Sequence, residues 1–94
     1  MENVAMELLS NASNMVIVRT PGRRFPGIVV QGDSLNALRA SAKSVVVGLI
    51  NARSAGAAGL DEVEEEARDL LERLQERVDA YEQCLRKHGI ELPY

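Results

Sequence analysis

The sequence predicts an α+β fold in which a three-stranded antiparallel sheet is followed by two α-helices, the second of them long and amphipathic. Three observations lead to this prediction. Short β-branched runs are separated by Gly, Pro, Ser and Asn in residues 1–31, and apolar residues then recur at helical spacing. The third observation is a highly charged, periodic segment over residues 60–89. We expect both helices to cover the sheet.

The first two strands are predicted from alternation and from β-branched residues. Val4, Met6 and Leu8 alternate with their neighbours, which predicts a strand over residues 4–9. Ser-Asn-Ala-Ser-Asn at residues 10–14 is typical of a connector. Met-Val-Ile-Val-Arg at residues 15–19 then predicts a second strand, apolar enough to be central or covered on both faces.

Two Pro-Gly dipeptides flank the paired basic residues Arg23 and Arg24. Pro sets φ at the second position of a type II turn and Gly accepts the positive φ of the third, so we expect turns at 20–23 and at 25–28. The third strand is expected at about residues 28–31. Three short strands joined by loops are typical of an antiparallel meander.

The first helix is expected to start at Asp33 or Ser34, whose side-chain oxygens suit a helix N-terminus. Apolar residues then follow at helical spacing. They are Leu35, Leu38, Ala42, Val45, Val46, Leu49 and Ile50. Small residues at 54–59 predict a flexible linker.

The second helix shows strong signals at both of its ends. Asp61 and Glu64 have the spacing of a capping box, and Gly89 after a basic last turn suits the residue that ends a helix. Pairs of opposite charge four residues apart add support. These pairs are Glu64–Arg68, Asp69–Arg73 and Glu82–Arg86.

One apolar stripe runs along this helix with heptad-like spacing and a stutter. It consists of Val63, Ala67, Leu70, Leu74, Val78, Tyr81 and Leu85. A helix of roughly 28 residues spans some 40 Å, which is longer than a three-stranded sheet is wide. We therefore expect a homodimer whose interface holds Leu70, Leu74, Val78, Tyr81 and Leu85.

Length and composition limit the class of protein. The 94 residues predict a single domain over 1–94, divided into a β-β-β-α part (1–53), the linker (54–59), the long acidic helix (60–89) and a tail (90–94). Aromatic residues are 3% of the chain, which argues against a base-stacking nucleic-acid surface. The apolar runs are too short to span a membrane, and the lone Cys84 cannot form an internal disulfide. We expect a cytoplasmic protein.

The net charge of −3 conceals an asymmetry between the two parts of the chain. Residues 1–59 hold six basic and three acidic groups, whereas residues 60–94 hold five basic and eleven acidic groups. A region with an excess of one charge creates an electrostatic field that steers charged partners. Runs of charge are also common on helix faces that only contact solvent. The candidate partner-binding residues are Arg23, Arg24, Glu65, Glu72, Glu76 and Asp79.

Two short motifs carry catalytic or metal-binding chemistry elsewhere, and here we expect neither function. Gly-Asp-Ser-Leu at residues 32–35 spells the signature of the GDSL hydrolases, but the position three residues before His88 is Leu85 and not a carboxylate. Ser34 therefore reads as a helix-capping residue. Cys84 and His88 share a helix face, but a structural zinc site needs four ligands. We expect no enzyme activity, no metal and no cofactor.

The run Phe-Pro-Gly at 25–27, the run Gln-Gly-Asp-Ser-Leu at 31–35 and Ala42-Lys43 together resemble the HicB-like antitoxin domain over residues 25–46. The resemblance implies a β-β-β-α start and a role in neutralising a small RNA-cleaving toxin, often as a dimer. The chain departs from that family in its first hairpin and in lacking a fourth strand after the helix. It also looks like a small bacterial family of unknown function with an Arg-Arg-Phe-Pro-Gly and Gln-Gly-Asp-Ser-Leu core.

These observations predict a non-enzymatic bacterial interaction protein that neutralises a toxin, as an antitoxin or an immunity protein. The acidic second helix would meet a basic toxin surface, since charge complementarity speeds encounter and gives specificity. The alternative is a structural homodimerisation module of unknown function with no toxin partner.

Overall fold

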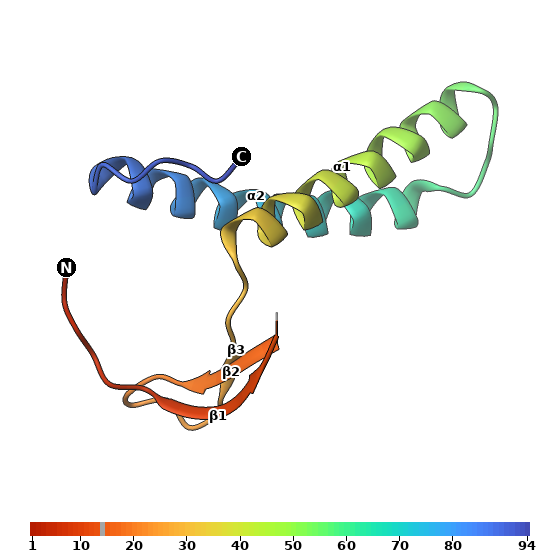
Figure 1. The fold of residues 1–94 in the computed structure, drawn as a ribbon. Coiled ribbons are helices and arrows are strands. Elements are labelled where there is room, and N and C mark those ends of the chain that lie inside the picture. The colour runs from red at the N-terminus through yellow and green to blue at the C-terminus, as the bar shows by residue number, and fades with distance from the viewer. Residues whose placement is uncertain (14) are drawn as a thin grey trace. The chain divides into compact units, whose positions relative to one another are not determined.

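A computed structural model describes residues 1–13 and 15–94 and confirms the α+β fold (Figure 1). Three strands come first, β1 (Glu7–Ala12), β2 (Met15–Arg19) and β3 (Gly27–Ile28), and two helices follow, α1 (Gly32–Ser54) and α2 (Asp61–Lys87). The chain divides into two compact units, the sheet unit over Met1–Gln31 and the helical unit over Gly32–Tyr94. The expectation of one domain stays a prediction.

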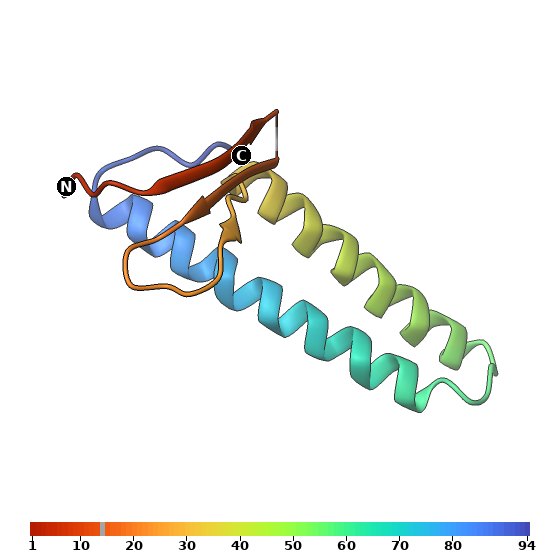
Figure 2. The same cartoon turned by 90° about the horizontal axis from the view of Figure 1, so that it is seen from below.

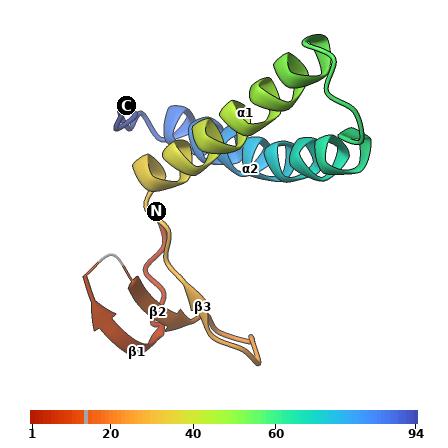
Figure 3. The same cartoon turned by 90° about the vertical axis from the view of Figure 1, so that its right-hand side faces the viewer.

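The three strands form an antiparallel sheet in the order β1-β2-β3 (Figure 3). The first strand begins at Glu7 and continues to Ala12, so its predicted bounds of 4–9 were wrong. The pairing jumps from Leu8 to Ser10, which makes Leu9 a β-bulge and breaks the simple alternation of faces. The expected connector 10–14 therefore belongs largely to β1, and its last residue, Asn14, lies outside the described residues.

The turn at 20–23 is confirmed, and the turn at 25–28 is not. Gly22 has a φ of 78°, and the Arg23 N–H donates to the Thr20 carbonyl at 3.2 Å. Gly27 has no positive φ and pairs with Val18 in β3 instead. Pairing with a neighbouring strand overrides the local turn preference here. The strand β3 covers only Gly27–Ile28, so its expected bounds of 28–31 were wrong.

The helical unit is an antiparallel hairpin in which α1 and α2 run side by side (Figure 2). The residues of α1 that lie nearest α2 follow strict 3-4 spacing. They are Gly32, Leu35, Arg39, Ala42, Val46, Leu49 and Arg53. The matching row of α2 also has strict 3-4 spacing. It consists of Glu64, Ala67, Leu71, Leu74, Val78, Tyr81 and Leu85. We call these two sets the inner rows.

The inner row of α2 corrects the predicted stripe at two positions. Glu64 and Leu71 replace Val63 and Leu70, which are 51% and 54% exposed. With this replacement the stutter disappears, because every step is now three or four residues in alternation. Val46 and Val78, at 4% and 1% exposure, mark the best-packed part of the hairpin.

Both helix N-termini differ from the prediction in their capping groups. The helix α1 begins at Gly32, and Asp33 rather than Ser34 supplies the oxygen, since Asp33 Oδ1 accepts the Ser34 backbone N–H at 2.8 Å. Leu60 stands at the N-cap of α2, and no described side chain caps it. The predicted capping box was wrong because the Glu64 carboxylate is held by two arginines instead.

The helix α2 ends at Lys87, and Gly89 follows its C-cap His88 as the predicted helix-stopping glycine. This residue has a φ of 67°, the left-handed conformation that glycine adopts without steric cost. The Gly89 N–H donates to the Arg86 carbonyl at 3.2 Å, and the Ile90 N–H donates to the Leu85 carbonyl at 2.9 Å. These two bonds form a Schellman motif, which satisfies carbonyls that the helix end would leave unpaired.

Candidate interaction surfaces of the helical hairpin

A buried carboxylate joins the two helices near the connecting loop. The side chain of Glu64 is only 6% exposed, and it contacts Arg53 of α1 and Arg68 one turn further along α2. The Arg68 Nη2 lies 2.9 Å from Glu64 Oε1, and Arg53 Nη2 also reaches Asp61 Oδ1 at 2.6 Å. A carboxylate is tolerated in the inner row because two guanidinium groups compensate its charge.

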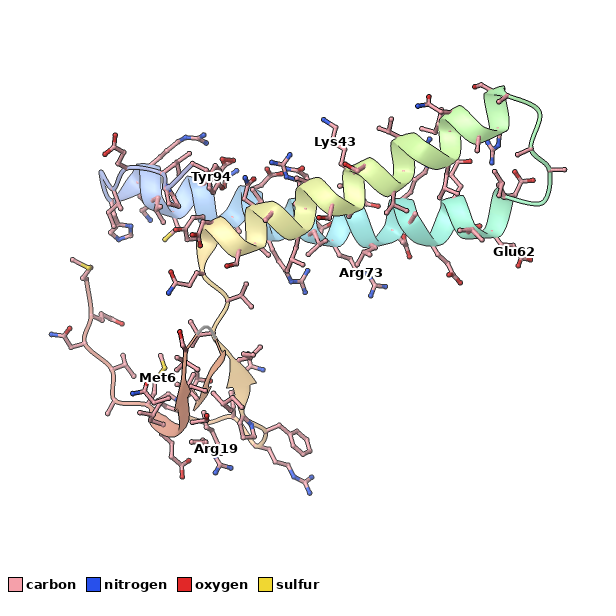
Figure 4. The ribbon with its side chains drawn as sticks, turned by 45° about the vertical axis from the view of Figure 1, so that its right-hand side comes forward. Met6, Arg19, Lys43, Glu62, Arg73 and Tyr94 are labelled. Carbon is pink, nitrogen blue, oxygen red and sulfur yellow. The ribbon has the colours of Figure 1, made fainter. Side chains whose placement is uncertain are left out.

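A charged groove of about 580 Å³ runs along one flank of the hairpin. Its walls hold three basic side chains, three acidic side chains, and Leu71 with Gln75. The charged ones are Arg39, Lys43, Arg68, Glu72, Glu76 and Asp79. Because residues from both helices line the same groove, Lys43, Arg68 and Gln75 lie on one flank of the hairpin. Figure 4 shows Lys43 and Arg73 pointing to opposite sides of it.

The candidate acidic residues lie together on α2. Glu65, Glu72 and Asp79 are seven residues apart, so they form one row along the helix, and Glu76 lies beside that row. All four are exposed. Glu72, Glu76 and Asp79 share the groove with three basic side chains. These side chains weaken the negative electrostatic potential that the acidic residues present to a partner. We call these four residues the acidic row.

The opposite flank of the hairpin is apolar. Most residues of the charged groove immediately follow an inner-row residue in the sequence. Five apolar residues immediately precede one, and they therefore lie on the opposite side of the hairpin. We call them the apolar flank: Leu38, Val45, Ala52, Val63 and Leu70. Leu38 and Val45 are 52% and 54% exposed, although the neighbouring Val46 is almost fully buried. Further along α2, Arg77 and Cys84 hold the positions that correspond to Val63 and Leu70 at seven-residue spacing.

The candidate dimer residues fall on two different faces. Leu74, Val78, Tyr81 and Leu85 belong to the inner row of α2, where α1 covers them. Leu70 lies on the apolar flank instead. The argument that this stripe lacks a partner within the chain therefore no longer holds for the four inner residues, and only Leu70 remains available to a second copy.

The candidate basic pair belongs to the sheet unit, whereas the acidic row belongs to the helical unit. Arg23 and Arg24 are exposed, and the Arg24 guanidinium stacks over the Phe25 ring at 5.3 Å from its centroid. The Arg24 carbonyl accepts a hydrogen bond from Arg19 Nη1 at 3.1 Å, and Arg19 also pairs with Glu7 at 2.6 Å. The loop is thus tied to its own strands.

Ser34, Cys84 and His88, the residues whose side chains could serve catalysis or metal binding, lie at the ends of the two helices. Ser34 lies in the first turn of α1. His88 Nδ1 lies 2.9 Å from the Cys84 carbonyl and 3.9 Å from the Cys84 sulfur, so the imidazole contacts the end of its own helix. Among residues 1–13 and 15–94, no three His, Cys, Asp or Glu side chains gather where they could hold a metal ion. No described helix is long and apolar enough to cross a membrane.

The C-terminal residue interacts with the hairpin in a way that sequence reasoning missed. Desolvation raises the pKa of the Tyr94 hydroxyl above 10.0, and its hydrogen bond to the Glu82 carboxylate raises it further. The positive charge of Arg39 acts in the opposite direction. The tail therefore lies near Glu82 of α2. A Pro-Tyr ending after a helix stop gives no sequence signal for this contact.

One contact between the helices was missed, because each helix was analysed by itself. Glu64 and Arg53 hold inner-row positions, and their contact across the hairpin was missed, whereas the pairing of Glu64 with Arg68 was predicted from spacing and is confirmed. The signal that could have found the missed contact is spacing, since strict 3-4 steps on each helix lead to an acidic residue on one and a basic residue on the other.

These features define a small α+β protein with a short sheet and a helical hairpin that exposes one charged and one apolar flank. The chain belongs to a family of unknown function, DUF6959, whose model matches residues 1–94. This membership agrees with the resemblance to a family of unknown function, while the resemblance to HicB-like antitoxins stays a prediction. No curated protein and no solved structure matches the chain.

Proposed function

We propose that this is a non-enzymatic bacterial interaction protein that works in the cytoplasm by binding other proteins through its helical hairpin. The observation that carries the proposal is the contrast between the two exposed surfaces. The acidic row and the apolar flank both lie outside the inner rows, so the hairpin does not use either to join its own helices. A contiguous exposed apolar surface is typical of protein interaction sites, and here it lies on the flank opposite the charged groove.

The acidic row supports a basic protein as one partner, in keeping with toxin neutralisation. The helix α2 holds ten acidic and five basic residues, a net charge of −5. A field of this sign accelerates association with a basic surface and makes the rate depend on salt. Buried anchors would then set the dissociation rate.

Comparative capture of partners from the native host tests this proposal. The unmodified protein is compared with Glu72→Lys/Glu76→Lys, which reverses charge in the acidic row. The matched control is Glu62→Lys/Glu66→Lys, which makes the same change on the same helix but outside the row. We expect a basic protein to be retained by the unmodified protein and by the control, and to be lost by the row variant.

Binding kinetics on the captured protein complete the test. We expect the row variant to associate more slowly at low salt, and the difference to shrink as salt rises. Equal binding by all three proteins, or a captured partner that is acidic, would contradict a role for the acidic row.

The second candidate function is a structural homodimerisation module with no toxin partner. The apolar flank favours this candidate, because its exposed residues come from both helices. In addition, α1 has no charged residue between Lys43 and Arg53. Failure to capture any partner, together with a stable dimer of the purified protein, would favour this candidate.

A further inference from the structure

The loop between β2 and β3 is tied to its own strands by contacts within the sheet unit. The Arg23 N–H donates to the Thr20 carbonyl at 3.2 Å and closes a turn. The Arg24 carbonyl accepts a hydrogen bond from Arg19 Nη1 at 3.1 Å, and Arg19 is itself paired with Glu7 of β1. A loop that is ordered before binding loses less conformational freedom when a partner arrives, so this loop is suited to recognition.

Two guanidinium groups of this loop, residues 20–26, lack a counter-charge, and we call it the basic loop. Arg23 and Arg24 are exposed, and neither forms an ion pair with a carboxylate among the residues that the structure describes. A guanidinium presents a planar fork of N–H donors, which matches the two oxygens of a carboxylate or a phosphate. The basic loop therefore offers two unpaired cations to an anionic partner.

An exposed aromatic ring lies beside these two arginines. Phe25 is 75% exposed, and among the described residues only Met1 has a large apolar side chain of greater exposure. The Arg24 guanidinium stacks over the Phe25 ring, so the charge and the ring form one surface. Arginine and aromatic residues are enriched at protein interfaces, where an aromatic side chain often provides the anchor.

We infer that the basic loop binds an acidic segment of a partner protein, in which carboxylates contact Arg23 and Arg24 and an apolar side chain contacts Phe25. This inference goes beyond the proposed function, because the surface belongs to the sheet unit and its partner has the opposite charge. It does not depend on whether the acidic row binds a basic protein.

The composition of the sheet unit favours a protein over other anionic partners. A single-stranded nucleic acid is bound by a basic groove with aromatic rings for successive bases. The sheet unit has one aromatic residue, and its three basic residues are nearly balanced by two acidic ones. An anionic membrane is recognised by clusters of about four to eight basic residues, which the basic loop does not have. A segment with a few carboxylates and one apolar side chain matches the two arginines and the ring.

Binding of a model peptide to the full chain tests the inference. The probe is a short fluorescein-labelled peptide that alternates Glu with Leu, and the control peptide has Gln in place of every Glu. Fluorescence anisotropy should show binding of the acidic peptide only. Arg23→Gln/Arg24→Gln should weaken that binding by about tenfold, because both cations are lost. Phe25→Ala should weaken it by about fivefold, because the apolar anchor is lost while both charges remain.

A matched variant shows whether the basic loop is the binding site. Arg73→Gln/Arg77→Gln removes two exposed arginines from α2 and should leave the affinity for the acidic peptide nearly unchanged. Circular dichroism checks that every variant is folded. Failure of the unmodified chain to bind the acidic peptide overturns the inference. An equal loss of affinity in the two double variants overturns it as well.

Two further comparisons test for other occupants of the basic loop. A single-stranded oligonucleotide that displaces the peptide and binds more tightly would make a nucleic acid the partner and overturn the inference. Glu72→Lys/Glu76→Lys and Glu62→Lys/Glu66→Lys change the net charge equally, but only the first alters the acidic row. A larger gain in peptide affinity for the first variant would mean that the acidic row already occupies the basic loop, which overturns the inference; equal gains support it. All these measurements use purified protein, so their outcome is independent of whether a basic partner is captured.

Discussion

The ring of Tyr81 lies directly against Gly32, where a side chain of any size would collide with it. A Cβ at Gly32 would overlap with the Tyr81 Cζ, Cε1 and hydroxyl oxygen. Gly32 begins α1 and Tyr81 lies near the end of α2, so this contact closes the open end of the hairpin. Glycine is required here for close approach and not for a positive φ.

We predict that Gly32→Ala destabilises the protein by about 1–2 kcal/mol, because the Tyr81 ring must swing away from its packed position. The matched control is Gly48→Ala in the middle of the same helix. Apart from the adjacent residues and the nearby backbone of α1 itself, no described heavy atom lies within 4 Å of a Cβ at Gly48. This change should therefore stabilise the protein by about 0.5–1 kcal/mol. Urea denaturation measures both. Stabilisation by Gly32→Ala would contradict the close contact.

The arginines around Glu64 should contribute unequally to stability. Arg53→Met removes the contacts from α1 to both Glu64 and Asp61, and it leaves the buried carboxylate with Arg68 alone. We expect a cost of about 1–3 kcal/mol, the range for under-compensating a buried polar group. Arg68→Met should cost less, because Arg53 still bridges the helices.

Thermal unfolding at low and high salt measures this difference. Arg73→Met is the control, since Arg73 and Asp69 are both exposed and lie 4.0 Å apart, a geometry that contributes little. Equal effects for Arg53→Met and Arg73→Met would contradict the importance of the Glu64 cluster.

The sequence predicts the order and type of all five elements. The pattern of apolar residues, however, placed Val63 and Leu70 of α2 on the wrong face of that helix. Gly22 and Gly89 were predicted correctly because a turn and a helix stop depend on local conformation. Gly27 was not, because its pairing with Val18 depends on another strand. Local signals therefore located the boundaries only where no distant contact competed.

The candidate surfaces were predicted less completely than the fold. The row of Glu65, Glu72 and Asp79 follows from helical spacing alone. The flank containing Val63 and Leu70 does not, because both residues were assigned to the inner face on polarity. The exposure of Val63 and Leu70, together with the contact between Glu64 and Arg53, shows that the inner row is shifted by one residue there. The pattern of one helix alone does not reveal this ion pair; the spacing of both helices has to be compared.

Leucines four residues apart on α2 should respond differently to the same substitution. Leu74 belongs to the inner row, so Leu74→Glu places a carboxylate against α1 without a counter-charge, which should cost more than about 2 kcal/mol. Leu70 is 54% exposed, and Leu70→Glu in dilute protein should change stability by less than about 0.5 kcal/mol. Chemical denaturation compares the two. Equal losses would contradict the assignment of the inner row.

The start of α1 should depend on Asp33 rather than on Ser34. Asp33 accepts the Ser34 backbone N–H, and its negative charge suits the first turn of a helix. Asp33→Ala should therefore cost about 1 kcal/mol, and Ser34→Ala should be nearly neutral. Denaturation midpoints of the two variants provide the measurement. The opposite order would restore Ser34 as the capping residue.

The Tyr94 hydroxyl should titrate above the usual tyrosine range. Desolvation favours its neutral form, and the neutral hydroxyl can donate to the Glu82 carboxylate whereas the phenolate cannot. Because the pKa is raised in the folded state, the stabilising contribution is fully present below pH 10. It is lost as the pH rises above 10 and passes through the pKa of the folded state.

NMR of ¹³C-labelled tyrosine resolves the titration of Tyr94 directly. Glu82→Gln removes the negative charge but keeps a side chain that can accept a hydrogen bond, so it should lower the pKa of Tyr94 toward 10.0 without abolishing the shift. Tyr94→Phe should remove part of the loss of stability in alkaline solution, because the ionising group is absent. A Tyr94 titration at or below the ordinary value would mean that the tail does not rest against Glu82. A shift unaffected by Glu82→Gln would leave desolvation as its only cause.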